Sequence, residues 1–352
     1  MRVFMPKPQM IVTLTVNPSL DRTIELPGPL IRGAVQRAAA ISEDPGGKGV
    51  NVSRALTASG LTSVAVLPGG DNDPVLAALR AADIRYANLP IPSALRSNIT
   101  LTEPDGTTTK VNVPGPPLDA ADQEALISLL VKTCAAGGDG SPAAWLVLAG
   151  SLPPGASPDL YALVAHAVRS HFGDAAPKIA IDSSGPPLLG ALMHDATPDL
   201  LKPNAEELAE VTGIGTEGEL EADPLLAVGA ARTLIARGVG AVLATLGPKG
   251  ALLVTAGGAW QATRPPVVAR STVGAGDSSL AGYLLAEVAG ALPGDRLRQA
   301  VAHGAAAASL PGTTVPTLAQ TDPGAVSVTE IVLPADAPGT GPAQSASLKE
   351  ED

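Results

Sequence analysis

A turn of small residues that leads into an apolar helix is the strongest chemical signal in this sequence. Residues 271–279 read Ser-Thr-Val-Gly-Ala-Gly-Asp-Ser-Ser and run into the apolar residues 280–285. Unpaired backbone N–H groups at a helix N-terminus favour a bound anion. A carboxylate beside such an anion is repelled unless it takes a proton from a hydroxyl nucleophile, so the pattern indicates phosphoryl transfer with Asp277 as the base. The alternative is a tight glycine turn in which Asp277 only caps the helix.

A second glycine-rich segment combines an open backbone with a cation and an amide. Residues 44–54 read Asp-Pro-Gly-Gly-Lys-Gly-Val-Asn-Val-Ser-Arg. Gly46 and Gly47 allow backbone amides to face a ligand, Lys48 supplies charge, and Asn51 can donate and accept hydrogen bonds. The segment is not a Walker A loop, because the sequence contains no Gly-x-x-x-x-Gly-Lys-Ser/Thr. The alternative is a loop with a solvated lysine.

Polar residues that flank predicted strands could bind the hydroxyl and phosphate groups of a ligand. Asp21 follows the first strand and could accept hydrogen bonds from two hydroxyls, although alone it would be a turn aspartate. Arg96 and Asn98 stand at the start of a predicted hairpin, and Lys110 lies on its second arm. Together with Lys48 these cations could hold the phosphate of the substrate. Each cation by itself would be an ordinary solvated surface residue.

Two segments contain a residue that could be a nucleophile, but neither has the surrounding residues that would activate it. Ser151 lies in the loop 150–155, which is not a Gly-x-Ser-x-Gly elbow and has no His–Asp pair near it in the sequence. Cys134 is the only cysteine, which excludes an intrachain disulfide and suits a reducing compartment. It ends an amphipathic run at 126–130, so we expect it to pack rather than react.

The elements that must position these residues alternate between strands and helices. This rhythm predicts an α/β fold with a mostly parallel sheet covered by helices. Residues 97–113 differ, because apolar and polar residues alternate on both sides of Pro-Asp-Gly, which predicts a hairpin. The expected strands are 10–16, 64–67, 145–148, 179–181, 200–201 and 241–245. The expected helices are 50–60, 74–82, 119–134, a helix from 157, 186–193, 205–212, 223–237, 276–289 and 295–309.

Composition narrows the functional class. Hydrophobic residues make up 45% of the 352 residues, aromatics only 2%, and the formal net charge is −11. An acidic chain with few aromatics argues against nucleic-acid binding. The absence of an 18-residue apolar run or a signal peptide predicts a cytoplasmic protein that does not span a membrane. Residues 1–9 are expected to be an extension, with either Met1 or Met10 as the start. Residues 321–352 are expected to be a mostly disordered acidic tail, with a short strand at 331–333.

The two glycine-rich motifs together resemble the PfkB/ribokinase family of carbohydrate kinases. Residues 46–53, with Gly60 and Gly70 after them, are similar to its first signature, and residues 271–284 to its second. The resemblance runs from about Met10 to Pro316. It implies a ribokinase-like domain over residues 10–320, with a mostly parallel central sheet, flanking helices and a small β-sheet lid from about 20–40 and 96–114. The lid would close over the sugar or pair with a second subunit in a homodimer.

The resemblance also implies roles for individual residues. Asp277 would be the catalytic base, and Gly274, Ala275 and Gly276 would form the anion hole. Asp21, Gly46, Gly47, Asn51 and the loop with Ser151 would bind the sugar. Lys202 would contact ATP, and Asn204 with Glu207 would organise Mg²⁺ with the ATP phosphates, partly through water; taken alone, those residues are a capped helix start. The nucleotide loop would be Thr245, Leu246, Gly247, Pro248, Lys249 and Gly250, with threonine where the family usually has serine.

The implied reaction uses MgATP to phosphorylate the C6 hydroxyl of fructose 1-phosphate. Gly-Gly-Lys-Gly is similar to the branch that acts on fructose 1-phosphate or tagatose 6-phosphate, whereas Lys110 is more like a cation of the 6-phosphofructokinase branch. Fructose 1-phosphate, tagatose 6-phosphate and fructose 6-phosphate therefore all remain possible substrates. The expected small-molecule partners are the sugar phosphate and ATP. A monovalent cation is a further candidate cofactor. The alternative of another class is a sugar-phosphate sensor with an inactive kinase fold.

Overall fold

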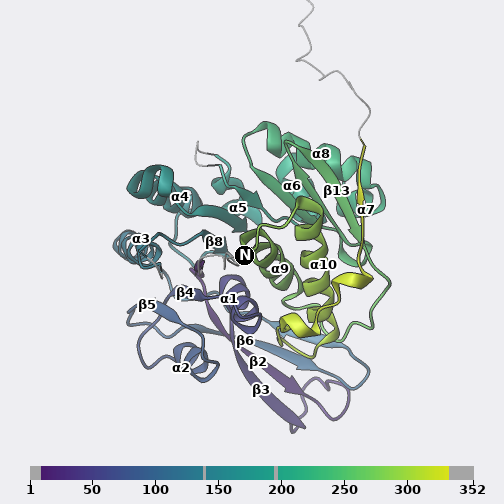
Figure 1. Cartoon of the computed structure of the whole chain (residues 1–352). Coiled ribbons are helices and arrows are strands. Elements are labelled where there is room, and N and C mark those ends of the chain that lie inside the picture. The colour runs from purple at the N-terminus through teal and green to yellow at the C-terminus, as the bar shows by residue number, and fades with distance from the viewer. Residues whose placement is uncertain (1–8, 138–139, 194–196, 333–352) are drawn as a thin grey trace, which may run out of the picture.

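The computed structural model describes residues 9–137, 140–193 and 197–332 and shows one large sheet between two layers of helices (Figure 1). Within these residues the sheet has ten strands, in the order β14-β13-β12-β11-β10-β9-β8-β1-β4-β5. The pairs from β5 to β11 are parallel, and those from β11 to β14 are antiparallel. The strands are β1 (Ile11–Leu14), β4 (Ser63–Pro68), β5 (Tyr86–Leu89), β8 (Trp145–Ala149), β9 (Lys178–Asp182), β10 (Leu200–Leu201), β11 (Ala241–Thr245), β12 (Ala251–Thr255), β13 (Gly258–Thr263) and β14 (Ser327–Glu330).

Alternating side chains divide the core into two layers. Val12 and Leu14 of β1 pack into the layer of α3 to α8, whereas Ile11 packs into that of α1, α9 and α10. Successive strand residues point to opposite faces, so a strand buried on both faces reads as continuously apolar. The fold class predicted from the sequence is confirmed. The helices are α1 (Lys48–Ala58), α2 (Pro74–Ala81), α3 (Ala120–Ala135), α4 (Leu160–Phe172), α5 (Gly185–Ala191), α6 (Ala205–Thr212), α7 (Glu217–Ala222), α8 (Pro224–Ala236), α9 (Ala275–Val288) and α10 (Pro293–Ser309).

A separate four-stranded sheet, the lid, has the order β3-β2-β6-β7. It consists of β2 (Ser19–Glu25), β3 (Ala40–Gly46), β6 (Arg96–Thr102) and β7 (Thr108–Val111), with β2 and β6 parallel. β2 and β3 lie between β1 and α1 in the chain, and β6 and β7 lie between β5 and α3. Figure 1 shows the lid projecting from the rest of the molecule beside α1 and α2.

The structure corrects several boundaries. The first lid segment, expected at about 20–40, continues to residue 46, because residues 40–46 form β3 and pair with β2 along their whole length. The helix expected from 157 begins at Leu160, and β5, β12 and β13 add strands that were not predicted. The acidic tail was predicted to begin at residue 321, but β14 pairs with β13, so the folded domain continues past residue 320. The short strand lies at Ser327–Glu330 rather than at 331–333. The predicted N-terminal extension and acidic tail lie outside the described residues over 1–8 and 333–352.

The anchored C-terminal segment makes a testable prediction. Val326 is 4% exposed and belongs to the core layer of α9 and α10. Val326→Ala should therefore lower the free energy of unfolding by about 1–2 kcal/mol, the cost of removing buried methyl groups. Urea unfolding measures this, with Val332→Ala as the control, because Val332 is 88% exposed. Equal midpoints for the two variants would contradict the packing of this segment.

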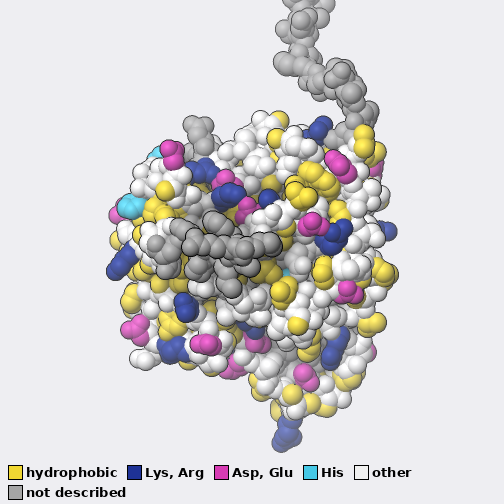
Figure 2. Space-filling model, viewed as in Figure 1, with side chains coloured by type: hydrophobic (Ala, Val, Ile, Leu, Met, Phe, Trp, Pro, Cys, Tyr) yellow, Lys and Arg dark blue, Asp and Glu magenta, His cyan; other side chains and the backbone are white. Residues whose placement is uncertain are grey.

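The molecular surface mixes both signs of charge. On the face drawn in Figure 2, Lys and Arg side chains are interspersed with Asp and Glu side chains. In the part of the chain that the structure describes, no helix has the length and apolarity needed to cross a membrane.

Candidate active site

A cavity of about 500 Å³ lies between the carboxyl ends of the parallel strands and the lid. Ligands of open α/β sheets bind at this edge, because the strands end there and the following helices begin there. The cavity collects most of the residues predicted from the sequence. Its lining consists of Thr15, Asn17, Ser19, Asp21, Gly47, Lys48, Asn51, Arg96, Asn98, Gly150, Ser151, Ser184, Lys202, Asn204, Glu207, Thr245, Val273, Gly274, Gly276 and Asp277.

Asp277 stands in the first turn of α9, at the bottom of this cavity. Gly274 precedes the helix with a φ of 76°, a left-handed conformation that glycine adopts without strain. The Asn51 side-chain amide donates a hydrogen bond of 2.9 Å to Oδ2 of Asp277. Burial and the nearby charge of Asp182 raise the pKa of Asp277 to about 6, although Lys48, Asn51 and Lys202 oppose the shift. A carboxylate with this pKa can take a proton near neutral pH.

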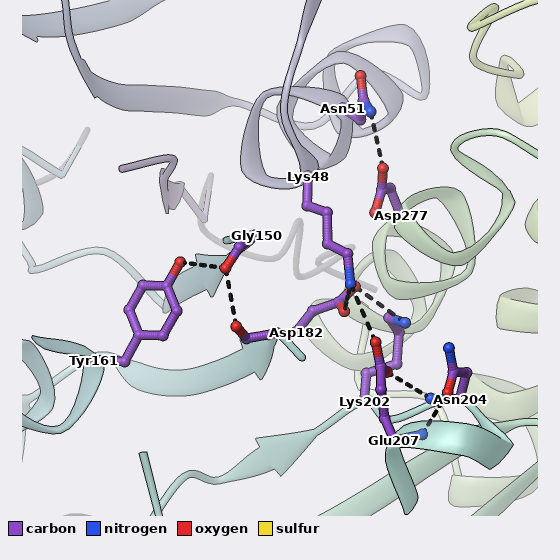
Figure 3. A network of polar contacts seen from close by, with 10 residues as sticks. Lys48, Asn51, Gly150, Tyr161, Asp182, Lys202, Asn204, Glu207 and Asp277 are labelled. Carbon is purple, nitrogen blue, oxygen red and sulfur yellow. Dashed lines mark hydrogen bonds and ion pairs between the residues drawn. The ribbon is translucent and has the colours of Figure 1, made fainter. Parts of the chain in front are cut away.

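Asp182, the last residue of β9, was not predicted as a site residue. Its side chain is fully buried and lies between two ammonium groups (Figure 3). Lys48 Nζ is 2.8 Å from Oδ1, and Lys202 Nζ is 3.0 Å from Oδ2. Burial raises the pKa of Asp182, but the two lysines lower it by more than burial raises it. The pKa is therefore below its usual value, and the group is a carboxylate. The sequence signal that could have found it is a carboxyl residue directly after a buried strand, at the binding edge of the sheet.

Asn204 and Glu207 form a reciprocal cap at the start of α6. The Asn204 side chain accepts from the Glu207 backbone N–H at 2.7 Å, and Glu207 Oε2 accepts from the Asn204 backbone N–H at 2.8 Å. Glu207 Oε1 lies 3.7 Å from Lys48 Nζ. Both residues line the cavity. A carboxylate and an amide oxygen are donors that suit Mg²⁺ shared with waters and phosphate oxygens.

Residues from the lid line the other side of the cavity. Asp21 Oδ1 accepts hydrogen bonds from Ser19 Oγ at 2.7 Å and from Asn98 Nδ2 at 3.0 Å. Gly46 stands directly behind this carboxylate, since a Cβ atom there would lie 2.2 Å from Asp21 Oδ2. Glycine at this position therefore allows Asp21 to take its place in the cavity.

The lid side also contains buried polar atoms that lack a hydrogen-bond partner. They belong to residues that line the cavity, and leaving each atom unpaired costs about 1–3 kcal/mol. The Arg96 guanidinium donates to the backbone carbonyls of Asn17 at 3.0 Å and Val113 at 3.1 Å. The atoms are Thr15 Oγ1, Asn17 Oδ1, Arg96 Nε and Asn98 Oδ1.

The loop after β8 reaches the same cavity. Gly150 has a φ of 99°, and both Tyr161 Oη and Ser183 Oγ donate to its carbonyl oxygen at 2.9 Å. These bonds fix the exit of the chain from β8. Ser151, the next residue, accepts from Asn17 Nδ2 at 3.3 Å.

Some predicted site residues do not line the cavity. Lys110 was expected to face the sugar, but it is exposed on β7, the outer strand of the lid. Of the predicted nucleotide loop, Thr245 lines the cavity and pairs with Asn204 in an isolated β-bridge. Leu246 is buried, and Gly247–Lys249 form an exposed 3₁₀ turn. Gly46, Gly250 and Ala275 likewise contribute no lining surface.

Known proteins are similar to this chain in sequence and in architecture. The pattern of the pfkB family of carbohydrate kinases matches residues 16–320. The 1-phosphofructokinase of Rhodobacter capsulatus is 37% identical over 286 residues, which cover 80% of this chain and 84% of that protein. The ATP-dependent 6-phosphofructokinase isozyme 2 of Mycobacterium tuberculosis is 34% identical over 309 residues, 86% of this chain and 85% of that protein. The structure of phosphofructokinase-2 from Escherichia coli in complex with potassium has a TM-score of 0.78 at 28% identity and covers 89% of this chain and 96% of that chain.

Proposed function

We propose that this chain, which belongs to the pfkB family of carbohydrate kinases, transfers the γ-phosphoryl group of ATP to the C6 hydroxyl of fructose 1-phosphate. The observation that carries the proposal is the buried Asp277 carboxylate at the N-terminus of α9, with a pKa near 6. The name of the Rhodobacter capsulatus relative supports the choice of fructose 1-phosphate. The Gly-Gly-Lys-Gly segment supports the same choice.

The proposed mechanism divides the work between the two sides of the cavity. Asp21 and Asn98 orient the sugar hydroxyls, and Arg96 holds the phosphate that the sugar already carries. Asp277 takes the proton of the C6 hydroxyl, the hydroxyl oxygen attacks the γ-phosphorus in line, and ADP leaves as the bond from the γ-phosphorus to the bridging oxygen breaks. The backbone N–H groups of residues 274–276 stabilise the charge that spreads over the transferring group.

The cofactor proposal follows from the same donor set. Asn204 and Glu207 would hold Mg²⁺ with the ATP phosphates, and the ion would neutralise charge on the transferring group. A monovalent cation is proposed as an activator, because the Escherichia coli neighbour was solved with potassium. Both requirements can be measured by removing each ion from the assay in turn.

The lid suggests how copies of the chain could associate. Ile41 on β3 and Val111 on β7 are 63% and 51% exposed. We propose a homodimer through this apolar side of the lid, as the sequence suggested, and a cytoplasmic location, where ATP and sugar phosphates are found. Light scattering of the purified chain measures the association.

A substrate panel tests the proposed function. An assay coupled to ADP release should give the highest kcat/KM with fructose 1-phosphate among fructose 1-phosphate, fructose 6-phosphate, tagatose 6-phosphate and free fructose. A preference for fructose 6-phosphate would favour the activity named for the Mycobacterium tuberculosis relative. Tight binding of a sugar phosphate without ADP release would instead favour an inactive sensor.

A further inference from the structure

We infer that Asp182 is a positioning residue for phosphoryl transfer, because its carboxylate holds the ammonium groups of Lys48 and Lys202 together beside the anion-hole turn. This inference rests on the proposed kinase function and adds a role for a residue outside both signature motifs. The two lysines come from distant segments of the chain. Lys48 opens α1, and Lys202 follows β10.

The geometry places Lys202 against the turn that would bind the transferring group. Its side chain is only 4% exposed, and its backbone N–H donates to the Ile181 carbonyl at 2.9 Å. A Cβ atom at Gly276 would lie 3.3 Å from Lys202 Nζ, so the ammonium group directly adjoins the first turn of α9. Asp182 therefore fixes a positive charge beside the backbone amides of that turn.

Lys48 is held on the same side of the cavity. Figure 3 shows its side chain extending toward Asp182 and Glu207. Nζ lies 2.8 Å from Asp182 and 3.7 Å from Glu207. This is the side of the proposed Mg²⁺ ligands, whereas Asp21 and Arg96 belong to the lid. Lys48 is thus placed for the transferring phosphoryl group, rather than for the phosphate that the sugar already carries.

A buried carboxylate between two lysines has a clear electrostatic role. Charges fixed in place before the reaction stabilise the transition state without reorganisation, and removing one such donor typically lowers kcat by ~10²–10³-fold. Without Asp182, the remaining carboxylates near these lysines are Glu207 and Asp277. An ammonium group that moved toward Asp277 would pair with the base instead of with the phosphoryl group.

The test is Asp182→Asn, with Asp199→Asn as the matched control. Asp199 accepts from the Ile179 backbone N–H at 2.8 Å and pairs with Arg169, at the opposite end of β9 from Asp182. Asp182→Asn should lower kcat by ~10²-fold while the KM values for ATP and fructose 1-phosphate stay within ~3-fold. Asp199→Asn should leave both parameters unchanged.

The pH profile separates positioning from a merely structural role. The charged groups that act on Asp277 are Asp182, Lys48 and Lys202, and Asp182 is the one that raises its pKa. Removing that charge lowers the pKa of the base, so the acid limb of kcat/KM should move to lower pH. A variant that had only lost folded protein would keep the limb in place.

Lys48→Met supplies a second, independent arm. It should reduce kcat/KM for fructose 1-phosphate and for free fructose by the same factor, because both reactions transfer the same phosphoryl group. A penalty confined to fructose 1-phosphate would overturn the inference, as would unchanged kinetics or an unmoved acid limb in Asp182→Asn.

If Asp182→Asn does not fold, the ratio of the two kcat/KM losses in Lys48→Met decides. A wild type that transfers no phosphoryl group would refute the proposed function and this inference with it, whereas an active wild type with unaffected variants would refute the inference alone.

Discussion

Asp277→Asn is expected to lower kcat by at least ~10²–10⁴-fold, the usual range for losing a positioned base. The amide cannot take the proton of the sugar hydroxyl, yet its oxygen can still accept the hydrogen bond from Asn51 that the carboxylate accepts at 2.9 Å. Binding of fructose 1-phosphate should therefore be nearly unchanged. Steady-state kinetics and calorimetric titration of the sugar phosphate measure the two effects separately.

The pH dependence of the wild type should reflect the same carboxylate. Its pKa rises from 3.8 to about 6 on folding, so activity should fall as the pH drops through about 6. The folded state then binds this proton more tightly than the unfolded state. The group's contribution to stability is present below pH 3.8 and is lost as the pH rises through about 6. Asp277→Asn should consequently be at least as stable as the wild type at pH 7.

Two results would remove Asp277 from the mechanism. One is a variant whose kcat stays within a few-fold of the wild type. The other is a wild-type profile that remains flat between pH 5 and 8. A melting temperature at pH 7 well below that of the wild type would instead show that the substitution had damaged the fold.

Arg96→Ala is expected to have a large effect on substrate choice, because it removes the cation that faces the cavity from the lid. A charge-assisted bond to a sheltered phosphate contributes ~1.5–3 kcal/mol, and ~1.4 kcal/mol corresponds to a tenfold change. The kcat/KM for fructose 1-phosphate should fall ~10–100-fold. The kcat/KM for free fructose should change only a few-fold, since that sugar has no phosphate for Arg96 to bind.

Arg22→Ala is the matched control for this prediction. Arg22 is also a lid arginine, but it is exposed, pairs with Glu43 at 2.8 Å and does not line the cavity. Its removal should leave both substrates unaffected. Equal losses for phosphorylated and free fructose in Arg96→Ala would mean that Arg96 supports the lid and does not recognise the phosphate.

The sequence predicted the elements whose patterns are local. The parallel strands read as apolar runs, and the cap of α3 was visible in Asp119, whose side chain accepts from the Asp122 backbone N–H. β3 was missed because Ser-Glu-Asp-Pro-Gly is a poor strand sequence, and four of its seven residues are exposed. Pairing with β2 alone makes it a strand. The strand β14 was predicted a few residues too late for the same reason, since its position depends on pairing with β13.

The site was predictable where glycine motifs marked it. Asn51 and Asp277 lie 226 residues apart and yet form a hydrogen bond, which agrees with two motifs that belong to one site. Asp182 was missed because a carboxyl residue directly after the predicted strand 179–181 suits a loop aspartate as well as a site carboxylate. Only the fold brings Lys48 and Lys202 to it. Lys110 was predicted to face the sugar because the sequence does not show which strand of a hairpin lies at the edge of the sheet.

The way the lid is inserted into the chain has a consequence for how such an enzyme can diversify. Its four strands belong to two chain segments, called excursions here, that leave the core fold and return to it. One lies between β1 and α1, and the other lies between β5 and α3. Asp21, Arg96 and Asn98 lie on these excursions, whereas Asp182, Lys202 and Asp277 belong to core elements. Insertions, deletions or substitutions in the excursions can therefore change the acceptor without altering the order or register of the core strands. Grafting both excursions from a kinase with another acceptor is accordingly a direct engineering route to a new specificity.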